Sequence, residues 1–110
     1  MTARRRLQNR RPNETHDLDI GGKRFAVKIG YFEDGTPGEI FIAGARVGSE
    51  LDAALSDGAI LASLALQHGV TPAALARSLS RLPAGGPFDR ATLPASPIGA
   101  AIDVLTTPVR

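Results

Sequence analysis

Cysteine and tryptophan are both absent from this chain of 110 residues. Without cysteine the chain holds no disulfide, no thiolate-bound metal and no iron–sulfur cluster, and thiol or thiyl chemistry is excluded. Aromatic residues are scarce, with four Phe and one Tyr, which argues against a single-strand binder that stacks bases on aromatic side chains. The two histidines, His16 and His68, lie far apart in the sequence, so we expect neither a transition-metal site nor another cofactor.

Long hydrophobic segments are missing as well. The longest nearly apolar run, Gly58 to Leu66, is less than half the length that spans a bilayer. No apolar segment follows the basic N-terminus, so we expect no secretory signal and take a cytoplasmic location as the default. The hydrophobic fraction of 43% is nevertheless too high for a disordered chain, and the length suits a single domain.

The charge is unevenly distributed. Residues 1–11 hold five arginines and no acid, namely Arg4, Arg5, Arg6, Arg10 and Arg11. Because the whole chain has a net charge of only +2, residues 12–110 carry a net charge of −3. The segment Met1–Pro12 has no apolar periodicity, so we predict a flexible basic arm that is extended or disordered, followed by one domain over residues 13–110.

Strands are predicted in the first half of the domain. Thr15–Ile20 and Arg24–Tyr31 alternate apolar and polar residues, which is typical of half-buried strands. The segment Phe32–Glu39 contains Asp-Gly and Pro-Gly, so it is expected to be a hairpin loop leading into a third strand at Ile40–Ala43. A three-stranded antiparallel meander is the simplest arrangement.

A long helix is predicted next, from about Glu50 to His68. Ser49 is its expected N-cap, and Gly69 its expected left-handed C-cap. The segment Ala59–Leu66 is apolar around nearly the whole circumference, so we expect the helix to be covered on more than one side.

Two shorter helices are expected near the C-terminus. Thr71 followed by Pro72 predicts a helix reaching about Arg81, and Ser96-Pro97 predicts another from Ile98 to about Leu105. The Gly/Pro-rich segment Leu82–Pro94 between them is predicted to be a loop. The expected fold class is therefore α+β, with a three-stranded antiparallel sheet followed by a long buried helix and two shorter helices.

Three strings of residues resemble a known family. They are Tyr31–Ile42 (YFEDGTPGEIFI), Gly48-Ser49 and Ser63–Val70 (SLALQHGV). They resemble the C-terminal region of adenosylcobalamin-dependent (class II) ribonucleotide reductases, which is often called the TSCPD domain. Weaker matches extend the resemblance over nearly the whole chain: Arg6-Leu7, Arg11-Pro12, Thr15, Ile20–Gly22, Pro94, Ile98 and Asp103.

The resemblance implies the fold of one accessory region and not the reaction. In the full reductase a cysteine thiyl radical activates the ribonucleotide and further cysteines supply electrons, whereas this chain has no cysteine. The cobalamin and substrate sites belong to a large barrel that is not part of this chain. We therefore assign no catalytic residue and no metal ligand.

The segment Glu33–Glu39 is the first candidate site. It brings three carboxylates close together in sequence, which suggests acid–base chemistry or Mg²⁺ binding. An exposed hairpin tip offers nothing to separate the pKa values of two carboxyl groups, as acid–base catalysis requires. Turn formation accounts for these residues better: Glu33, Asp34, Gly35, Pro37, Gly38 and Glu39.

The start of the long helix is the second candidate. Gly48 and Ser49 precede it, and free backbone N–H groups at a helix N-terminus attract anions such as phosphate. The acids Glu50 and Asp52 in the first turn oppose an incoming anion, so an ordinary N-cap is the competing interpretation. At the other end of the helix, His68 is expected to cap the helix and not to act in catalysis.

The five arginines of the arm are the third candidate. They suit salt-dependent contacts with nucleic-acid phosphates, although a solubility tail or an inter-domain connection is the favoured explanation. The leading hypothesis is a non-catalytic binding or regulatory module that acts through protein–protein contact, and the alternative is a small nucleic-acid- or nucleotide-binding protein. Expected partners are a second copy of the chain, as a two-fold dimer, or a reductase large subunit, without any membrane contact.

Overall fold

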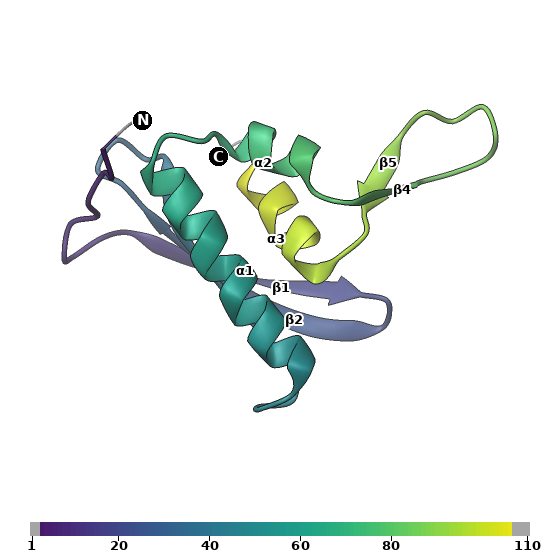
Figure 1. Ribbon diagram of the computed structural model, residues 1–110, viewed down its shortest axis with the longest axis horizontal. Coiled ribbons are helices and arrows are strands. Elements are labelled where there is room, and N and C mark those ends of the chain that lie inside the picture. Colours follow the sequence, from purple (N-terminus) through teal and green to yellow (C-terminus); the bar gives the residue numbers. More distant parts are fainter. Residues whose placement is uncertain (1–2, 107–110) are drawn as a thin grey trace.

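The computed structural model describes residues 3–106 and has the predicted α+β fold (Figure 1). A three-stranded sheet comes first, followed by a long helix, a short helix, a small hairpin and a last helix. The elements are β1 (Asn13–Ile20), β2 (Lys23–Tyr31), β3 (Pro37–Ala43), α1 (Glu50–Gln67), α2 (Pro72–Ser78), β4 (Arg81–Pro83), β5 (Thr92–Pro94) and α3 (Pro97–Leu105).

The main sheet is an antiparallel meander in the order β1-β2-β3, so β3 is an edge strand. Cross-strand pairs on its inner face are apolar, for example Val27 with Ile42. The pair of Lys28 with Phe41 lies on the outer face, where both side chains are exposed. The sheet therefore buries one face, as its alternating sequence predicts.

Helices α1 and α3 cover the inner face. Helix α1 packs mainly along β3, whereas α3 contacts all three strands. Their buried residues join those of the sheet in one core: Phe25, Val27, Ile29, Ile40, Ile42, Leu55, Ala59, Ala62, Ala101 and Ile102. A Cβ on Gly58 would lie 2.9 Å from the Ile98 side chain, so glycine at this position lets α3 approach α1 closely.

Helix α1 is buried along one face only. Its buried residues are Leu55, Ala59, Ala62, Leu66 and Gln67. Ile60 and Leu61 are 58% and 67% exposed, so the expectation that the helix is covered on more than one side is wrong for residues 3–106. Within the part of the chain that the structure describes, the second apolar side of α1 is left as an exposed surface.

Three further boundaries differ from the sequence prediction. Strand β3 begins at Pro37 and not at Ile40, because the tight turn at Phe32–Thr36 returns the chain to the sheet at once. Helix α2 ends at Ser78, before the predicted Arg81. The predicted loop Leu82–Pro94 contains most of the hairpin of β4 and β5, whose three-residue strands are too short to show a periodicity.

The predicted caps are confirmed. The side-chain oxygens of Ser49, Thr71 and Ser96 each accept a hydrogen bond from a backbone N–H in the first turn of the helix that follows. Gly69 has a φ of 93°, as a left-handed C-cap requires.

No helix within residues 3–106 is long and apolar enough to cross a membrane.

Candidate functional site

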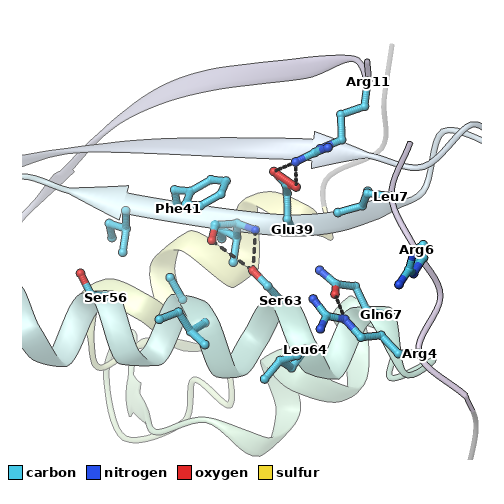
Figure 2. Close-up of a pocket in the computed structure, with 14 residues that line it drawn as sticks. Arg4, Arg6, Leu7, Arg11, Glu39, Phe41, Ser56, Ser63, Leu64 and Gln67 are labelled. Carbon is cyan, nitrogen blue, oxygen red and sulfur yellow. Dashed lines mark hydrogen bonds and ion pairs between the residues drawn. The ribbon is translucent and has the colours of Figure 1, made fainter. Parts of the chain in front are cut away.

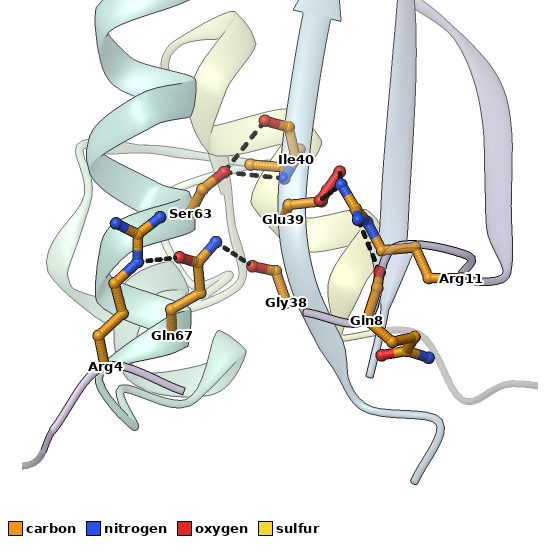
Figure 3. A network of polar contacts seen from close by, with 8 residues as sticks. All are labelled: Arg4, Gln8, Arg11, Gly38, Glu39, Ile40, Ser63 and Gln67. Carbon is orange, nitrogen blue, oxygen red and sulfur yellow. Dashed lines mark hydrogen bonds and ion pairs between the residues drawn. The ribbon is translucent and has the colours of Figure 1, made fainter. Parts of the chain in front are cut away.

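Two of the strings singled out in the sequence lie against each other in space. Ser63 of α1 faces Ile40 of β3, where its Oγ accepts a hydrogen bond from the Ile40 N–H at 2.9 Å and donates one to the Ile40 carbonyl at 3.2 Å (Figure 3). The hydroxyl bonds to the two backbone groups that a neighbouring strand would otherwise pair with. The helix thus closes part of the free edge of β3, which would otherwise be open to pairing with another chain.

Gln67 continues this contact one turn further along α1. Its Nε2 donates to the Gly38 carbonyl at 2.9 Å, and its Oε1 accepts from Arg4 Nε at 2.7 Å (Figure 3). Its main-chain carbonyl accepts from the Arg5 N–H at 2.6 Å. Both polar atoms of the buried Gln67 amide therefore have hydrogen-bond partners, and these bonds connect the arm to α1 and β3.

Glu39 holds the other end of the arm. Nη2 of Arg11 lies 2.7 Å from Glu39 Oε2 and donates to Oε1 at 2.9 Å, so one nitrogen meets both oxygens of the carboxylate. Arg11 additionally donates to the Gln8 carbonyl at 2.8 Å (Figure 3). Glu39 is only 7% exposed. Its placement in an exposed hairpin loop is therefore wrong, since it lies within β3 and its carboxylate is paired with Arg11.

Arg5 joins the arm to the turn before β3. Its guanidinium carbon lies 3.8 Å from the centroid of the Phe32 ring, and its Nη1 lies 3.2 Å from Asp34 Oδ2. The pKa of Asp34 is lowered to about 2, mainly by the hydrogen bond from the Thr36 side chain, then by the Thr36 N–H and Arg5. Asp34 therefore stays ionised at physiological pH and acts as a turn residue.

The basic arm is thus packed against the domain. Residues 3–12 form neither helix nor strand, and Arg4, Arg5 and Arg11 are each bonded to the domain. Arg6 and Arg10 make no hydrogen bond or ion pair within residues 3–106. Sequence periodicity does not detect such packing, because it depends on single contacts between distant residues.

A groove runs beside this network, between α1, β3 and the arm, and we name it the α1–β3 groove (Figure 2). Its volume is about 1020 Å³. Ile60 and Leu64 of α1 and Ile42 of β3 make it apolar, and Arg4 and Arg6 line it from the arm. The groove is therefore apolar along α1 and β3 and positively charged where the arm borders it.

The candidate carboxylates do not form a cluster. Glu33 and Asp34 are exposed in the turn, Gly35 has the left-handed φ of 84° that the turn needs, and Glu39 is paired with Arg11. Within residues 3–106 no three His, Cys, Asp or Glu side chains are placed to hold a metal ion. Pro37 and Gly38 belong to β3, and a Cβ on Gly38 would collide with the Phe32 ring at 2.8 Å.

The start of α1 is occupied by its own residues. Ser49 Oγ accepts from the Asp52 N–H at 3.1 Å and donates to the Arg46 carbonyl at 2.6 Å. The Asp52 carboxylate accepts from the Gly48 N–H at 3.0 Å. The Gly48 N–H thus already meets a carboxylate of the chain and the Asp52 N–H meets the Ser49 hydroxyl, as in an ordinary cap.

A small α+β domain whose helix closes the edge of its sheet is the class of protein that these observations define. The TSCPD domain family matches residues 2–104, and the chain belongs to this family. No solved structure matches significantly.

Three similar relatives each have the name vitamin B12-dependent ribonucleotide reductase. The one from Agrobacterium fabrum is 40% identical over 67 residues, which is 61% of this chain and 5% of the reductase. Those from Rhodopirellula baltica and Bradyrhizobium diazoefficiens are both 36% identical, over 61% and 64% of this chain and 6% of each reductase. The chain therefore corresponds to only a small part of these enzymes.

Replacing Ser63 by alanine is expected to lower the free energy of unfolding by about 1–2 kcal/mol, because the Ile40 N–H and carbonyl both lose their partner. Ser56 lines the same groove but makes no side-chain hydrogen bond within residues 3–106, so Ser56→Ala is the matched control and should stay within about 0.5 kcal/mol. Urea denaturation measures both variants. Equal stability of the two would show that Ser63 does not protect the edge of β3.

Proposed function

We propose that this chain is a non-catalytic binding module of the TSCPD family that acts through protein–protein contact, with the α1–β3 groove as its contact surface. One observation carries the proposal. Ile60 lines the groove beside Leu64 and is 58% exposed. Apolar surface of this kind beside polar groups is typical of interaction sites.

The relatives support a role in partnership with a larger protein. In each of them the matched segment is a small part of a chain named as a reductase, so the segment there belongs to a much larger protein. This chain has no cysteine for the chemistry of such an enzyme. An accessory role is therefore favoured, and a reductase large subunit is the first partner to test. The proposed location is the cytoplasm.

Nucleic-acid binding through the arm is the alternative, and the contacts favour it less. Arg4, Arg5 and Arg11 already bond to groups of the chain, which leaves Arg6 and Arg10 as the arginines most able to meet phosphates. Two separated charges supply little of the salt-dependent affinity that several phosphate contacts give together.

Capture from native lysate with identification by mass spectrometry tests the proposal. The bait is the wild-type chain, the variant Ile60→Glu or the matched variant Leu61→Glu, since both residues are exposed on α1 but only Ile60 lines the groove. We expect wild type and Leu61→Glu to retain a class II reductase chain and Ile60→Glu to lose it, because a carboxylate is costly to bury in an apolar contact.

Two outcomes would contradict the proposal. Equal retention by all three baits would show that the partner does not use the groove. Recovery that depends on nucleic acid, and disappears after nuclease treatment, would favour the alternative function.

A further inference from the structure

The β4–β5 hairpin presents a single aromatic side chain to solvent. Phe88 lies in its connecting segment and is 97% exposed. The segment is held by its own hydrogen bonds, from the Ala84 N–H to the Ala91 carbonyl and from the Ala91 N–H to Asp89 Oδ1. An aromatic side chain on an ordered tip is the type of residue that anchors protein interfaces.

The hairpin cannot reach the groove of its own chain. It projects from one side of the molecule, whereas the arm that borders the groove lies on the opposite side (Figure 1). A contact between Phe88 and the α1–β3 groove therefore has to join two molecules.

The groove accepts a side chain more readily than an added strand. Pairing with a foreign strand would need the free backbone groups of β3, but Gln67 already bonds to the Gly38 carbonyl and Ser63 to both groups of Ile40. What stays open is the apolar wall formed by Ile60 and Leu64. A volume of about 1020 Å³ admits a phenyl ring together with the turn that holds it.

One charged pair of the two surfaces is complementary. Asp89 follows Phe88 directly in the sequence, and the groove ends at the guanidinium groups of Arg4 and Arg6. Arg90, the next residue of the hairpin, is exposed and has the opposite charge, so it has to stay outside the groove when Asp89 enters. Within residues 3–106 Arg6 makes no hydrogen bond or ion pair. Its charge is therefore available to a carboxylate that enters beside the aromatic ring.

We propose that the α1–β3 groove binds the hairpin of a second copy of this chain, with Phe88 of the partner against Ile60 and Leu64 and Asp89 of the partner facing Arg6. Two such contacts related by a two-fold axis close a dimer. The proposal rests on the same groove as the proposed function. In the dimer the hairpin of the second copy occupies the groove, and a partner protein has to displace this hairpin to bind.

Light scattering across ~1–100 µM, a range that covers moderate affinities, tests the self-association. We expect the mass of wild type to rise with concentration from 11.5 kDa towards twice that value. The variant Phe88→Ser should raise the dimer dissociation constant at least tenfold. Val47→Ser is its matched control, because Val47 is also large, apolar and 91% exposed but lies away from the hairpin and the groove, and it should dimerise like wild type.

Mixing two defective variants tests which surfaces meet. Ile60→Glu damages the groove and leaves the hairpin intact, whereas Phe88→Ser does the reverse. Neither should self-associate, but an equimolar mixture should form a mixed dimer through its one intact contact.

A charge exchange tests the contact between Asp89 and Arg6. Asp89→Arg and Arg6→Glu should each weaken the dimer, and the double variant should recover part of the affinity. Arg10→Glu, outside the groove, should have no such effect.

A mass of 11.5 kDa for wild type at every concentration would overturn the proposal, as would a dimer that Phe88→Ser leaves unchanged. Either result is distinguishable from a failure of the proposed function. The Phe88→Ser variant keeps an intact groove, so it should still bind the partner protein, and a monomeric chain that binds this partner would contradict the dimer alone.

Discussion

Replacing Leu55 by alanine is expected to lower the free energy of unfolding by about 2–5 kcal/mol, the range for a fully buried leucine. Leu55 belongs to the core that α1 forms with the sheet and α3. The same substitution at Leu64, on the same helix, should cost less than about 2 kcal/mol, because Leu64 is half-buried and lines the groove. Urea denaturation, fitted with the same m value for both variants, compares their free energies of unfolding.

The difference between the two leucines matters for function as well as for stability. Sequence alone places Leu64 in the most apolar part of the helix, where a fully buried side chain is expected. An equal cost at both positions would mean that the groove is closed in solution and that α1 is covered on both sides. A larger cost at Leu55 would support the open groove on which the proposed function depends.

Replacing Arg11 by alanine is expected to destabilise the chain by about 2–3 kcal/mol. Removal of one partner of a buried ion pair leaves an uncompensated charge, which costs about 3–5 kcal/mol when both groups are fully buried. The side chain of Glu39 is 9% exposed but that of Arg11 is 31% exposed, so water reduces the effect. The neighbouring Arg10 is exposed and unpaired within residues 3–106, and Arg10→Ala should stay within about 0.5 kcal/mol.

A double-mutant cycle separates the ion pair from other effects of Arg11. In the background of Glu39→Gln, which carries no charge at this position, Arg11→Ala should cost much less than in wild type. Undiminished destabilisation in that background would attribute the effect to the bond from Arg11 to the Gln8 carbonyl. If Arg11→Ala or Glu39→Gln releases the arm from the domain, the Phe32 ring, which Arg5 covers, should also become exposed.

Local sequence patterns predicted the elements of the fold well. Alternation located β1 and β2, and the cap residues Ser49, Thr71 and Ser96 marked the starts of α1, α2 and α3. These signals are strong because each depends on residues within one turn or one strand. The β4–β5 hairpin was missed because three residues are too few to establish an alternation.

The candidate site was harder to predict, for a different reason. The bonds that form it join distant residues: Arg4 with Gln67, Arg11 with Glu39, and Ser63 with Ile40. No local pattern encodes such pairs. The resemblance did single out the strings that contain Ser63, Gln67 and Glu39, but it did not indicate that they meet in space or that the arm holds them together.

Isothermal titration of a class II reductase chain with the wild-type protein, Ile60→Glu and Leu61→Glu tests the central claim most directly. If the α1–β3 groove is the contact surface, wild type and Leu61→Glu bind with the same affinity, and Ile60→Glu binds at least tenfold more weakly. Equal affinities for all three proteins, or no heat of binding for the wild type across ~1–100 µM, would contradict it.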